Sequence, residues 1–180
     1  MGGRNLLLTG APGVGKTTVI KKVAQILADR EVRGFYTEEI RAGRQRQGFK
    51  IVTLDGAEGL LAHVDFPGPP RVSRYGVDVA GFEALVLPCL RGEGASLVLI
   101  DEIGKMECFS AAFVERVRTL LESETPVLAA IARSGGGFIA EVKRREDVEI
   151  IEVTRANRNE LPRRIVEKVA AASGLLKAQT

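Results

Sequence analysis

A glycine-rich run followed by a lysine and two threonines lies near the start of the chain. Residues 10–18 read Gly-Ala-Pro-Gly-Val-Gly-Lys-Thr-Thr, which matches the G-x-x-x-x-G-K-[ST] pattern. In such a loop the backbone N–H groups hold phosphate oxygens, the lysine reaches the β- and γ-phosphates, and the hydroxyl binds Mg²⁺. The pattern predicts a nucleoside-triphosphate site formed by Gly10, Ala11, Pro12, Gly13, Val14, Gly15, Lys16, Thr17 and Thr18.

Two carboxylates follow an apolar run farther along the chain. Residues 96–100 read Ser-Leu-Val-Leu-Ile, and Asp101 and Glu102 come directly after them. Such a run is typical of a central parallel strand, and α/β proteins bind ligands at the carboxyl ends of these strands. We interpret Asp101, together with the Thr17 hydroxyl, as the Mg²⁺ site. Glu102 is placed to polarise a water aimed at the γ-phosphorus, so Lys16 and Glu102 are the candidate catalytic residues.

The adjacent carboxylates also bear on the type of reaction. A hydrolase must position water, whereas a small-molecule kinase must exclude water and bind an acceptor, so Asp101-Glu102 favours a hydrolase. The transition state also calls for a positive group. The sequence leaves open whether a partner's arginine supplies it or one of five residues in the chain, which are Lys105, Arg133, Arg41, Arg44 and Arg46.

The nucleotide base is expected against the segment that leads into the last helix. Asn157 and Arg158 lie there. The asparagine could form a hydrogen bond with a base edge, and the guanidinium could stack on the base. Helix capping and surface charge would explain the same pair, and the sequence leaves both interpretations open.

Strands and helices must position these groups, and the pattern of apolar residues predicts where they lie. Strands are predicted at residues 4–9, 34–40, 49–54, 96–100, 126–132 and 148–153. Helices are predicted at residues 15–30, 78–91 and 110–122, in a short segment that ends at Arg145, and from Asn159 onward. Because strands alternate with helices, we expect an α/β fold with a mostly parallel sheet flanked by helices in three layers.

Two regions depart from this alternation. Residues 34–54 contain two strand-like runs around a turn and predict a β-hairpin insertion near the site. Residues 55–77 are rich in glycine, proline and arginine. We expect a long loop there that contains no more than one short strand, and loops of this length are usually functional.

The length and composition indicate one domain that spans residues 1–180. No apolar run is long enough to cross a membrane and the N-terminus lacks a signal-peptide pattern, so we expect neither a membrane protein nor a secreted one. The net charge of +3 suits an anionic ligand without requiring nucleic acid. Cys89 and Cys108 are far apart and indicate free thiols in a reducing compartment. We therefore expect a cytoplasmic protein, and we expect a monomer.

Five stretches together resemble one known family in their order and spacing. They are Gly-Ala-Pro-Gly-Val-Gly-Lys-Thr-Thr at 10–18, Gly-Phe-Tyr-Thr-Glu-Glu at 34–39, Gly48-Phe49 with Val52-Thr53-Leu54, Asp-Glu-Ile-Gly-Lys-Met-Glu at 101–107, and Asn-Arg-Asn at 157–159. The chain resembles the THEP-type nucleoside-triphosphatases, a family of small P-loop proteins. Many families share the first stretch, whereas the second and fourth are far more specific.

The resemblance implies a RecA-like P-loop NTPase domain and Mg²⁺-dependent hydrolysis of nucleoside triphosphates, among them ATP and GTP, to the diphosphate and phosphate. It also implies broad choice of base and slow turnover. Residues 97–104, including Ile103 and Gly104, correspond to the Walker B segment of the family and belong to the binding site. Residues 60–77 and 133–140 match no motif of the family.

Two other functions remain open at the level of sequence. The phosphate loop also resembles that of nucleotide and nucleoside kinases, although no arginine-rich lid or acceptor pocket is evident. A nucleotide-gated switch that binds nucleic acid or a protein partner is suggested by the basic residues at 41–46 and 143–145. The absence of tryptophan and the scarcity of other aromatic residues count against binding of single strands.

Overall fold

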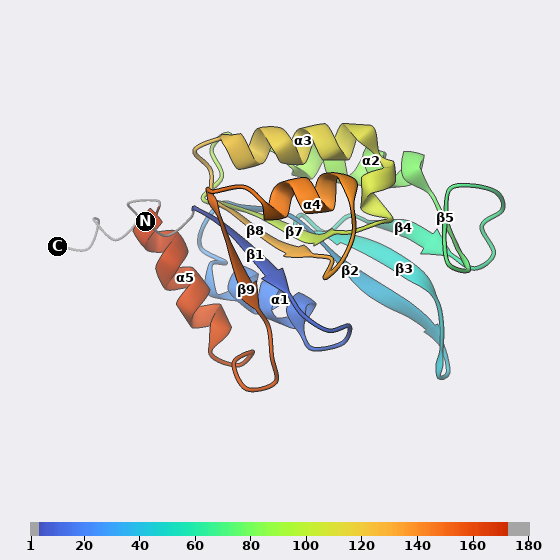
Figure 1. Ribbon diagram of the computed structural model, residues 1–180, viewed down its shortest axis with the longest axis horizontal. Coiled ribbons are helices and arrows are strands. Elements are labelled where there is room, and N and C mark those ends of the chain that lie inside the picture. The colour runs from blue at the N-terminus through green and yellow to red at the C-terminus, as the bar shows by residue number, and fades with distance from the viewer. Residues whose placement is uncertain (1–3, 173–180) are drawn as a thin grey trace.

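The computed structural model describes residues 4–172, and the strands within that range form one sheet (Figure 1). Its order is β5-β6-β4-β3-β2-β7-β8-β1-β9. The strands are β1 (Asn5–Thr9), β2 (Val32–Ala42), β3 (Gln45–Thr53), β4 (Glu58–His63), β5 (Arg71–Val72), β6 (Tyr75–Val77), β7 (Leu97–Ile103), β8 (Val127–Ile131) and β9 (Val148–Glu152). The helices are α1 (Lys16–Ile26), α2 (Val79–Cys89), α3 (Ala111–Glu122), α4 (Gly137–Lys143) and α5 (Leu161–Ala172), with a 3₁₀ turn at Glu107–Phe109.

The strands β2, β7, β8, β1 and β9 form the parallel half of the sheet, as the sequence predicted. Each neighbouring pair in this series is parallel, and β8 lies between β1 and β7. The carboxyl ends of β1, β7 and β8 therefore meet at one edge of the sheet. This edge brings together the glycine-rich loop after β1, the two carboxylates at the end of β7 and the segment after β8.

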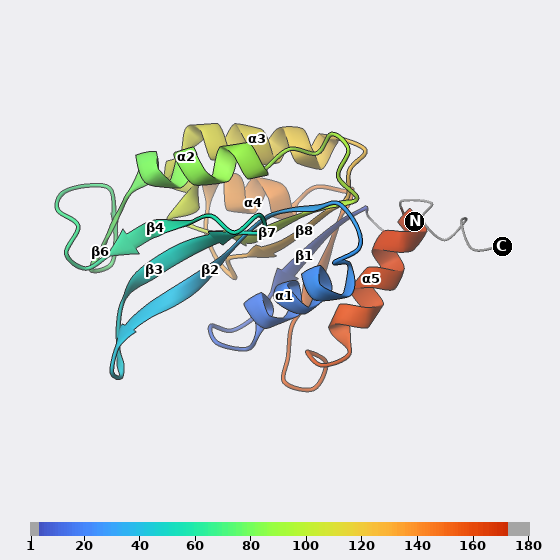
Figure 2. The same ribbon diagram turned by 180° about the vertical axis from the view of Figure 1, so that it is seen from behind.

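Helices cover both faces of the sheet. Figures 1 and 2 show α2, α3 and α4 on one face and α1 and α5 on the other. Side chains along β1 alternate between the two cores. Leu7 belongs to the cluster beneath α2, α3 and α4, whereas Leu6 and Leu8 belong to the cluster beneath α1 and α5. The predicted three-layer α/β fold is confirmed. Within residues 4–172, no helix has both the length and the apolar character needed to cross a membrane.

The predicted β-hairpin is present, but its first strand does more than the sequence indicated. β2 pairs antiparallel with β3 over most of its length. Its first residues, Val32 to Phe35, pair in parallel with β7. β2 therefore belongs to the parallel half of the sheet at its start and to the β2–β3 hairpin over most of its length. The remaining pairs, β3 with β4, β4 with β6 and β5 with β6, are antiparallel.

The prediction of a long loop at residues 55–77 is wrong, because β4, β5 and β6 all lie within it. Glycine is typical of turns, but two glycines of this segment lie inside strands. A Cβ at Gly59 would lie 2.3 Å from the Leu85 side chain, and one at Gly76 would lie 2.5 Å from the Phe66 carbonyl oxygen. Close approach of neighbouring segments explains both residues.

Replacing Gly34 with alanine is expected to lower the free energy of unfolding by on the order of 3 kcal/mol. Gly34 has φ +125°, and a Cβ there would lie 1.8 Å from the carbonyl oxygen of Leu99 on β7. The β2–β7 pairing must shift to relieve this collision. Urea unfolding of wild type and variant measures the effect.

Gly43→Ala is the matched control. Gly43 also has a positive φ of +59°, but no atom lies within 4 Å of its Cβ position. Its replacement is expected to cost only about 1–2 kcal/mol, from backbone strain alone. Equal losses in the two variants would contradict the assignment of the Gly34 effect to the contact with β7.

Candidate active site

The glycine-rich loop joins β1 to α1 and presents a lysine over its own backbone. α1 begins at Lys16, and Gly15 before it has a left-handed conformation with φ 113°. The Lys16 ammonium donates to the carbonyl oxygens of Gly10 at 3.1 Å and Ala11 at 3.3 Å. The first N–H groups of a helix have no partner within the helix, and the helix dipole adds partial positive charge there. The loop is therefore built to bind an anion of phosphate size.

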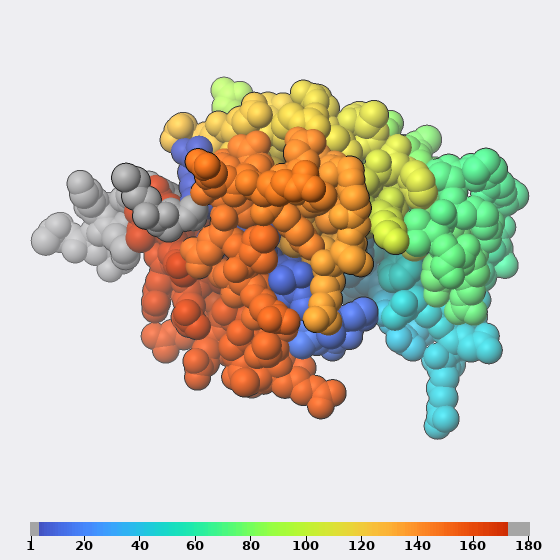
Figure 3. All heavy atoms as spheres, viewed as in Figure 1, coloured from blue at the N-terminus to red at the C-terminus, as the bar shows by residue number. Residues whose placement is uncertain are grey.

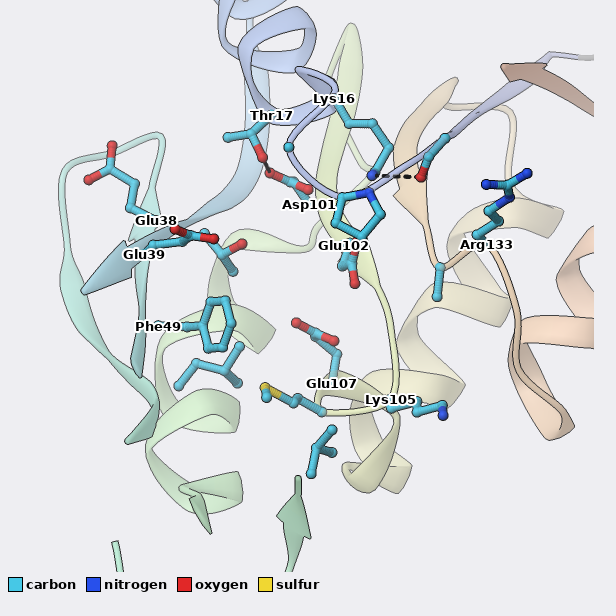
Figure 4. Close-up of a pocket in the computed structure, with 18 of the residues that line it drawn as sticks. Lys16, Thr17, Glu38, Glu39, Phe49, Asp101, Glu102, Lys105, Glu107 and Arg133 are labelled. Carbon is cyan, nitrogen blue, oxygen red and sulfur yellow. Dashed lines mark hydrogen bonds between the residues drawn. The ribbon is translucent and has the colours of Figure 1, made fainter. Parts of the chain in front are cut away.

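The carboxylates at the end of β7 face this loop. The Thr17 hydroxyl donates to the Asp101 carboxylate at 2.5 Å, and both residues are labelled in Figure 4. Asp101 is only 3% exposed. Burial raises the pKa of Asp101 to about 6, although the hydrogen bond from Thr17 and the charge of Lys16 oppose the shift. Burial also raises the pKa of Glu102, again against the effect of Lys16.

The Thr17 and Asp101 oxygens fit Mg²⁺, which prefers hard oxygen ligands and binds through one or two carboxylates together with substrate phosphates. Within residues 4–172, no group of three or more His, Cys, Asp or Glu side chains is arranged to hold a metal. If Mg²⁺ binds there, Thr17 and Asp101 would supply part of its coordination shell, and the phosphates of a bound nucleotide would supply more of it.

A cavity of about 700 Å³ opens in front of the loop and the carboxylates. Figure 3 shows the surface hollowed between the phosphate loop, in blue, and the β2–β3 hairpin, in cyan. Nine of the predicted residues line it, namely Gly10, Pro12, Gly13, Gly15, Lys16, Thr17, Thr18, Asp101 and Glu102. Six do not, namely Ala11, Val14, Ile103, Gly104, Asn157 and Arg158. The structure therefore unites most of the predicted phosphate and metal ligands with the predicted base.

Glu107 is a further functional candidate, and no pattern in the sequence assigned a role to it. It lines the cavity although it is only 4% exposed, and its carboxylate faces the region of Glu102 in Figure 4. A Cβ at Gly104 would lie 2.6 Å from a carboxylate oxygen of Glu102 and 2.8 Å from one of Glu107. Gly104 therefore leaves room for both carboxyl groups. Burial, together with the charge of Glu102, raises the pKa of Glu107 to about 8.

The variant Glu107→Gln is expected to gain stability over wild type as the pH rises from about 4.5 to about 8. In this window the unfolded chain has lost the Glu107 proton, whose ordinary pKa is 4.5, while the folded protein still holds it. The free energy of unfolding of wild type therefore falls with rising pH. Below this pH window both states hold the proton, so the titration of Glu107 no longer changes the free energy of unfolding.

Because glutamine does not titrate, the advantage of the variant at pH 8 is expected to be on the order of a few kcal/mol. Urea unfolding at pH 5, 6.5 and 8 in EDTA measures it. Glu124→Gln is the control, because the Glu124 side chain is 96% exposed and its ion pair with Arg4 lies at the surface. An advantage of Glu107→Gln that is constant with pH would show that Glu107 is not held protonated.

The structure separates the five candidate cations into two groups. Arg46, Lys105 and Arg133 line the cavity, whereas Arg41 and Arg44 do not. Arg46 is paired with Glu39 and lies over the Phe49 ring at 5.3 Å. Lys105 points away from the two glutamates in Figure 4, and Arg133 is exposed. Among residues 4–172, none of the three makes a side-chain hydrogen bond or ion pair with Lys16 or the phosphate loop.

Most of the basic residues that suggested nucleic-acid binding have partners within the chain. Arg41 pairs with Glu39. Lys143 donates to the carbonyl oxygens of Ala132 and Arg133, just after β8, and Arg145 pairs with Asp147 at 2.8 Å. A nucleic acid would have to displace or share these contacts.

Asn157 and Arg158 lie in the segment after β9 and do not line the cavity. The Asn157 amide is used within its own segment, where it accepts from the Thr154 N–H and donates to the Glu152 carbonyl oxygen, both at 2.8 Å. Arg158 donates to the Val14 carbonyl oxygen at 3.1 Å. Asn157 thus shapes the segment after β9, and Arg158 reaches the loop itself.

Comparison with known proteins agrees with this geometry. A family model described as NTPase matches residues 5–166. Nucleoside-triphosphatase THEP1 of Thermotoga maritima is 46% identical over 158 residues, which cover 87% of this chain and 90% of the relative. The human cancer-related nucleoside-triphosphatase is 45% identical over 175 residues, covering 88% of this chain and 92% of the relative.

Two solved structures are similar over nearly their whole length. The crystal structure of THEP1 from the hyperthermophile Aquifex aeolicus superposes with a TM-score of 0.85 at 36% identity, covering 92% of this chain and 98% of that one. The solution structure of a human cancer-related nucleoside triphosphatase gives a TM-score of 0.80 at 43% identity, covering 93% of this chain and 98% of that one.

Proposed function

Because the chain belongs to the nucleoside-triphosphatase family, its activity is the hydrolysis of nucleoside triphosphates, and we propose how its own residues perform it. One observation carries the proposal. The Thr17 hydroxyl and the Asp101 carboxylate are joined at 2.5 Å, and Lys16 and Glu102 line the same cavity. Phosphate ligands, a metal site and a candidate base therefore meet in one place.

The phosphate loop and Lys16 bind the triphosphate. Backbone N–H groups of residues 10–18 would hold the α- and β-phosphates, and Lys16 would leave its two loop carbonyls to contact the β- and γ-phosphates. Thr17 and Asp101 would hold Mg²⁺, which neutralises charge on the β- and γ-phosphate oxygens when bound. The γ-phosphate then faces the cavity.

Glu102 activates the attacking water. Its carboxylate accepts a proton from a water whose oxygen attacks the γ-phosphorus, while the bond from that phosphorus to the bridging oxygen of the β-phosphate breaks. The nucleoside diphosphate leaves and inorganic phosphate forms. A raised pKa suits this role, because a carboxylate of higher pKa is a stronger base.

Broad choice of base and slow turnover complete the proposal. The base would lie outside the cavity against Arg158, whose guanidinium can stack on any of the common bases. The Asn157 amide is already hydrogen-bonded to the backbone through both its oxygen and its nitrogen. Few donors or acceptors therefore remain on it to recognise a particular base edge. Turnover is slow because Arg46, which lines the cavity, is already paired with Glu39.

Phosphate release from ATP, GTP, CTP and UTP tests the proposal. We expect slow release from all four with Mg²⁺ at rates within about tenfold of one another, which is a difference of about 1.4 kcal/mol. We expect no release when EDTA is present. Release from only one nucleotide would contradict the broad specificity, and release in EDTA would contradict the role of Mg²⁺.

Arg158→Ala is expected to weaken binding of all four triphosphates by about five- to thirtyfold, the equivalent of 1–2 kcal/mol of lost stacking. Binding of inorganic tripolyphosphate should be unchanged, because that ligand has no base. Calorimetric titration compares the ligands. If tripolyphosphate weakened as much as ATP, Arg158 would act by shaping the loop through Val14 instead.

The protein is further proposed to be a cytoplasmic monomer. Its free cysteines and ordinary composition support this proposal. Light scattering after size exclusion should give a mass near 19.4 kDa, and a mass near twice that value would contradict it.

A further inference from the structure

The cavity in front of the phosphate loop extends well beyond the space that phosphates need. Its near end is the loop and the carboxylates of β7. Its far end is an apolar wall supplied by three strands and the turn after β7, consisting of Phe49, Leu61, Val72 and Met106. Figure 4 shows Phe49 and Glu107 across the cavity from Lys16.

A bound triphosphate does not account for this far end. The γ-phosphate is the group nearest Lys16, Thr17 and Asp101, so the rest of the nucleotide leads away from the cavity toward Arg158. A hydrolytic water has a volume of only about 30 Å³. The whole cavity, at about 700 Å³, is of the size that holds a drug-sized ligand.

The charges at the far end are largely neutralised among the protein's own groups. Glu39 is paired with Arg41 and Arg46, and Arg46 lies over the Phe49 ring. Glu107 is buried, with only 4% of its surface exposed. An uncharged ligand would therefore fit better than an anion. The Phe49 ring and its aliphatic neighbours suit the face of a flat ring, while the carboxyl groups can accept hydrogen bonds from O–H or N–H groups.

We propose that the far end of the cavity binds a nucleoside, and that the site transfers the γ-phosphoryl group to a hydroxyl of this nucleoside. The proposal rests on the triphosphate placement given above. The hydroxyl oxygen attacks the γ-phosphorus, its proton passes to the Glu102 carboxylate, and the bond to the bridging oxygen of the β-phosphate breaks. The products are a nucleoside monophosphate and a nucleoside diphosphate. Hydrolysis is the same step with water in place of the acceptor.

Transfer is tested with ATP labelled in the γ-phosphate. Adenosine, guanosine, cytidine and uridine are each added to wild type with Mg²⁺, and labelled monophosphate and free phosphate are separated. We expect labelled monophosphate from at least one nucleoside, with less free phosphate than without it. Phe49→Ala should lower the ratio of transfer to hydrolysis at least tenfold. Leu60→Ala is the matched control, since Leu60 is on the same strand as Leu61 but is 42% exposed and outside the cavity.

Binding is tested independently of any variant. The chain has two methionines, Met1 and Met106, and Met106 lines the cavity. In protein labelled with ¹³C at the methionine methyl groups and saturated with Mg²⁺ and ADP, the accepted nucleoside should shift the Met106 resonance. No shift with any of the four nucleosides would overturn the proposal.

The outcomes separate this inference from the proposed hydrolysis. Phosphate release without an acceptor, together with no monophosphate from any nucleoside, would overturn the inference and leave the hydrolysis standing. Monophosphate formation without any release of phosphate in the absence of nucleoside would do the reverse. An equal fall in the transfer ratio for Leu60→Ala and Phe49→Ala would overturn the assignment to this cavity.

Discussion

Replacing Glu102 with glutamine is expected to slow triphosphate hydrolysis by about 10²–10⁴-fold, the range that a general base contributes. Glutamine keeps the shape of the side chain but cannot accept the proton of the attacking water. Binding of Mg²⁺-ATP should stay within about threefold of wild type, a difference under about 1 kcal/mol, because Lys16, Thr17 and Asp101 remain in place.

Single-turnover release of phosphate measures the chemical step, and calorimetric titration measures binding. Glu124→Gln, at an exposed position, controls for the change in net charge. If Glu102→Gln lost binding and turnover by the same factor, Glu102 would be a structural residue that supports the Thr17–Asp101 contact. If it retained full turnover, another group would have to be the base.

The near end of the cavity, formed by the phosphate loop and the carboxylates of β7, could be predicted because each part is a short run of consecutive residues. The loop at residues 10–18 carries its phosphate ligands within nine consecutive residues, and the strand before Asp101 is recognisable by its apolar run. The parallel sheet then brings the two together, because β8 lies between β1 and β7 and all three end at the same edge. Each step from residue to element to site follows from a short pattern.

The far end of the cavity could not be predicted, because its residues come from separate strands. How these strands align depends on tertiary packing and not on a local pattern. Phe49, Leu61 and Val72 lie on β3, β4 and β5, and the last two strands fall in the region that composition indicated to be a loop. Glu107 was visible in the sequence, but its raised pKa arises from burial, which no local pattern reveals. Likewise, only the contacts of Arg46 with Glu39 and Phe49 show that this cation is already engaged.

This difference explains why the sequence favoured hydrolysis over transfer. Asp101 and Glu102 favoured hydrolysis, but a carboxylate that accepts a proton from water can equally accept one from a hydroxyl. The distinction between the two reactions lies in what occupies the space before the γ-phosphate. Phe49, Leu61 and Val72 of the antiparallel strands line that space, so the proposed choice of nucleophile depends on the part of the sheet that was hardest to predict.

Replacing Lys16 with alanine is expected to weaken binding of ATP by about 10–100-fold, because a charge-assisted interaction contributes about 1.5–3 kcal/mol. Hydrolysis at saturating ATP should fall as well, by about 10²–10³-fold, since the same ammonium stabilises charge that develops in the transition state. In the structure this ammonium is held over the loop by two carbonyl oxygens, so it is placed to turn toward a phosphate.

Comparison of ligands shows whether the loss arises at the phosphates. Adenosine lacks phosphate groups, so its dissociation constant should be unchanged in Lys16→Ala, while those of ADP and ATP should rise. Lys22→Ala, on the exposed side of α1, removes the same charge away from the loop and should leave all three unchanged. If adenosine and ATP weakened equally in Lys16→Ala, the variant would have disturbed the loop as a whole. The phosphate contacts assigned to Lys16 would then be wrong, and the backbone N–H groups at the start of α1 would have to hold the γ-phosphate alone.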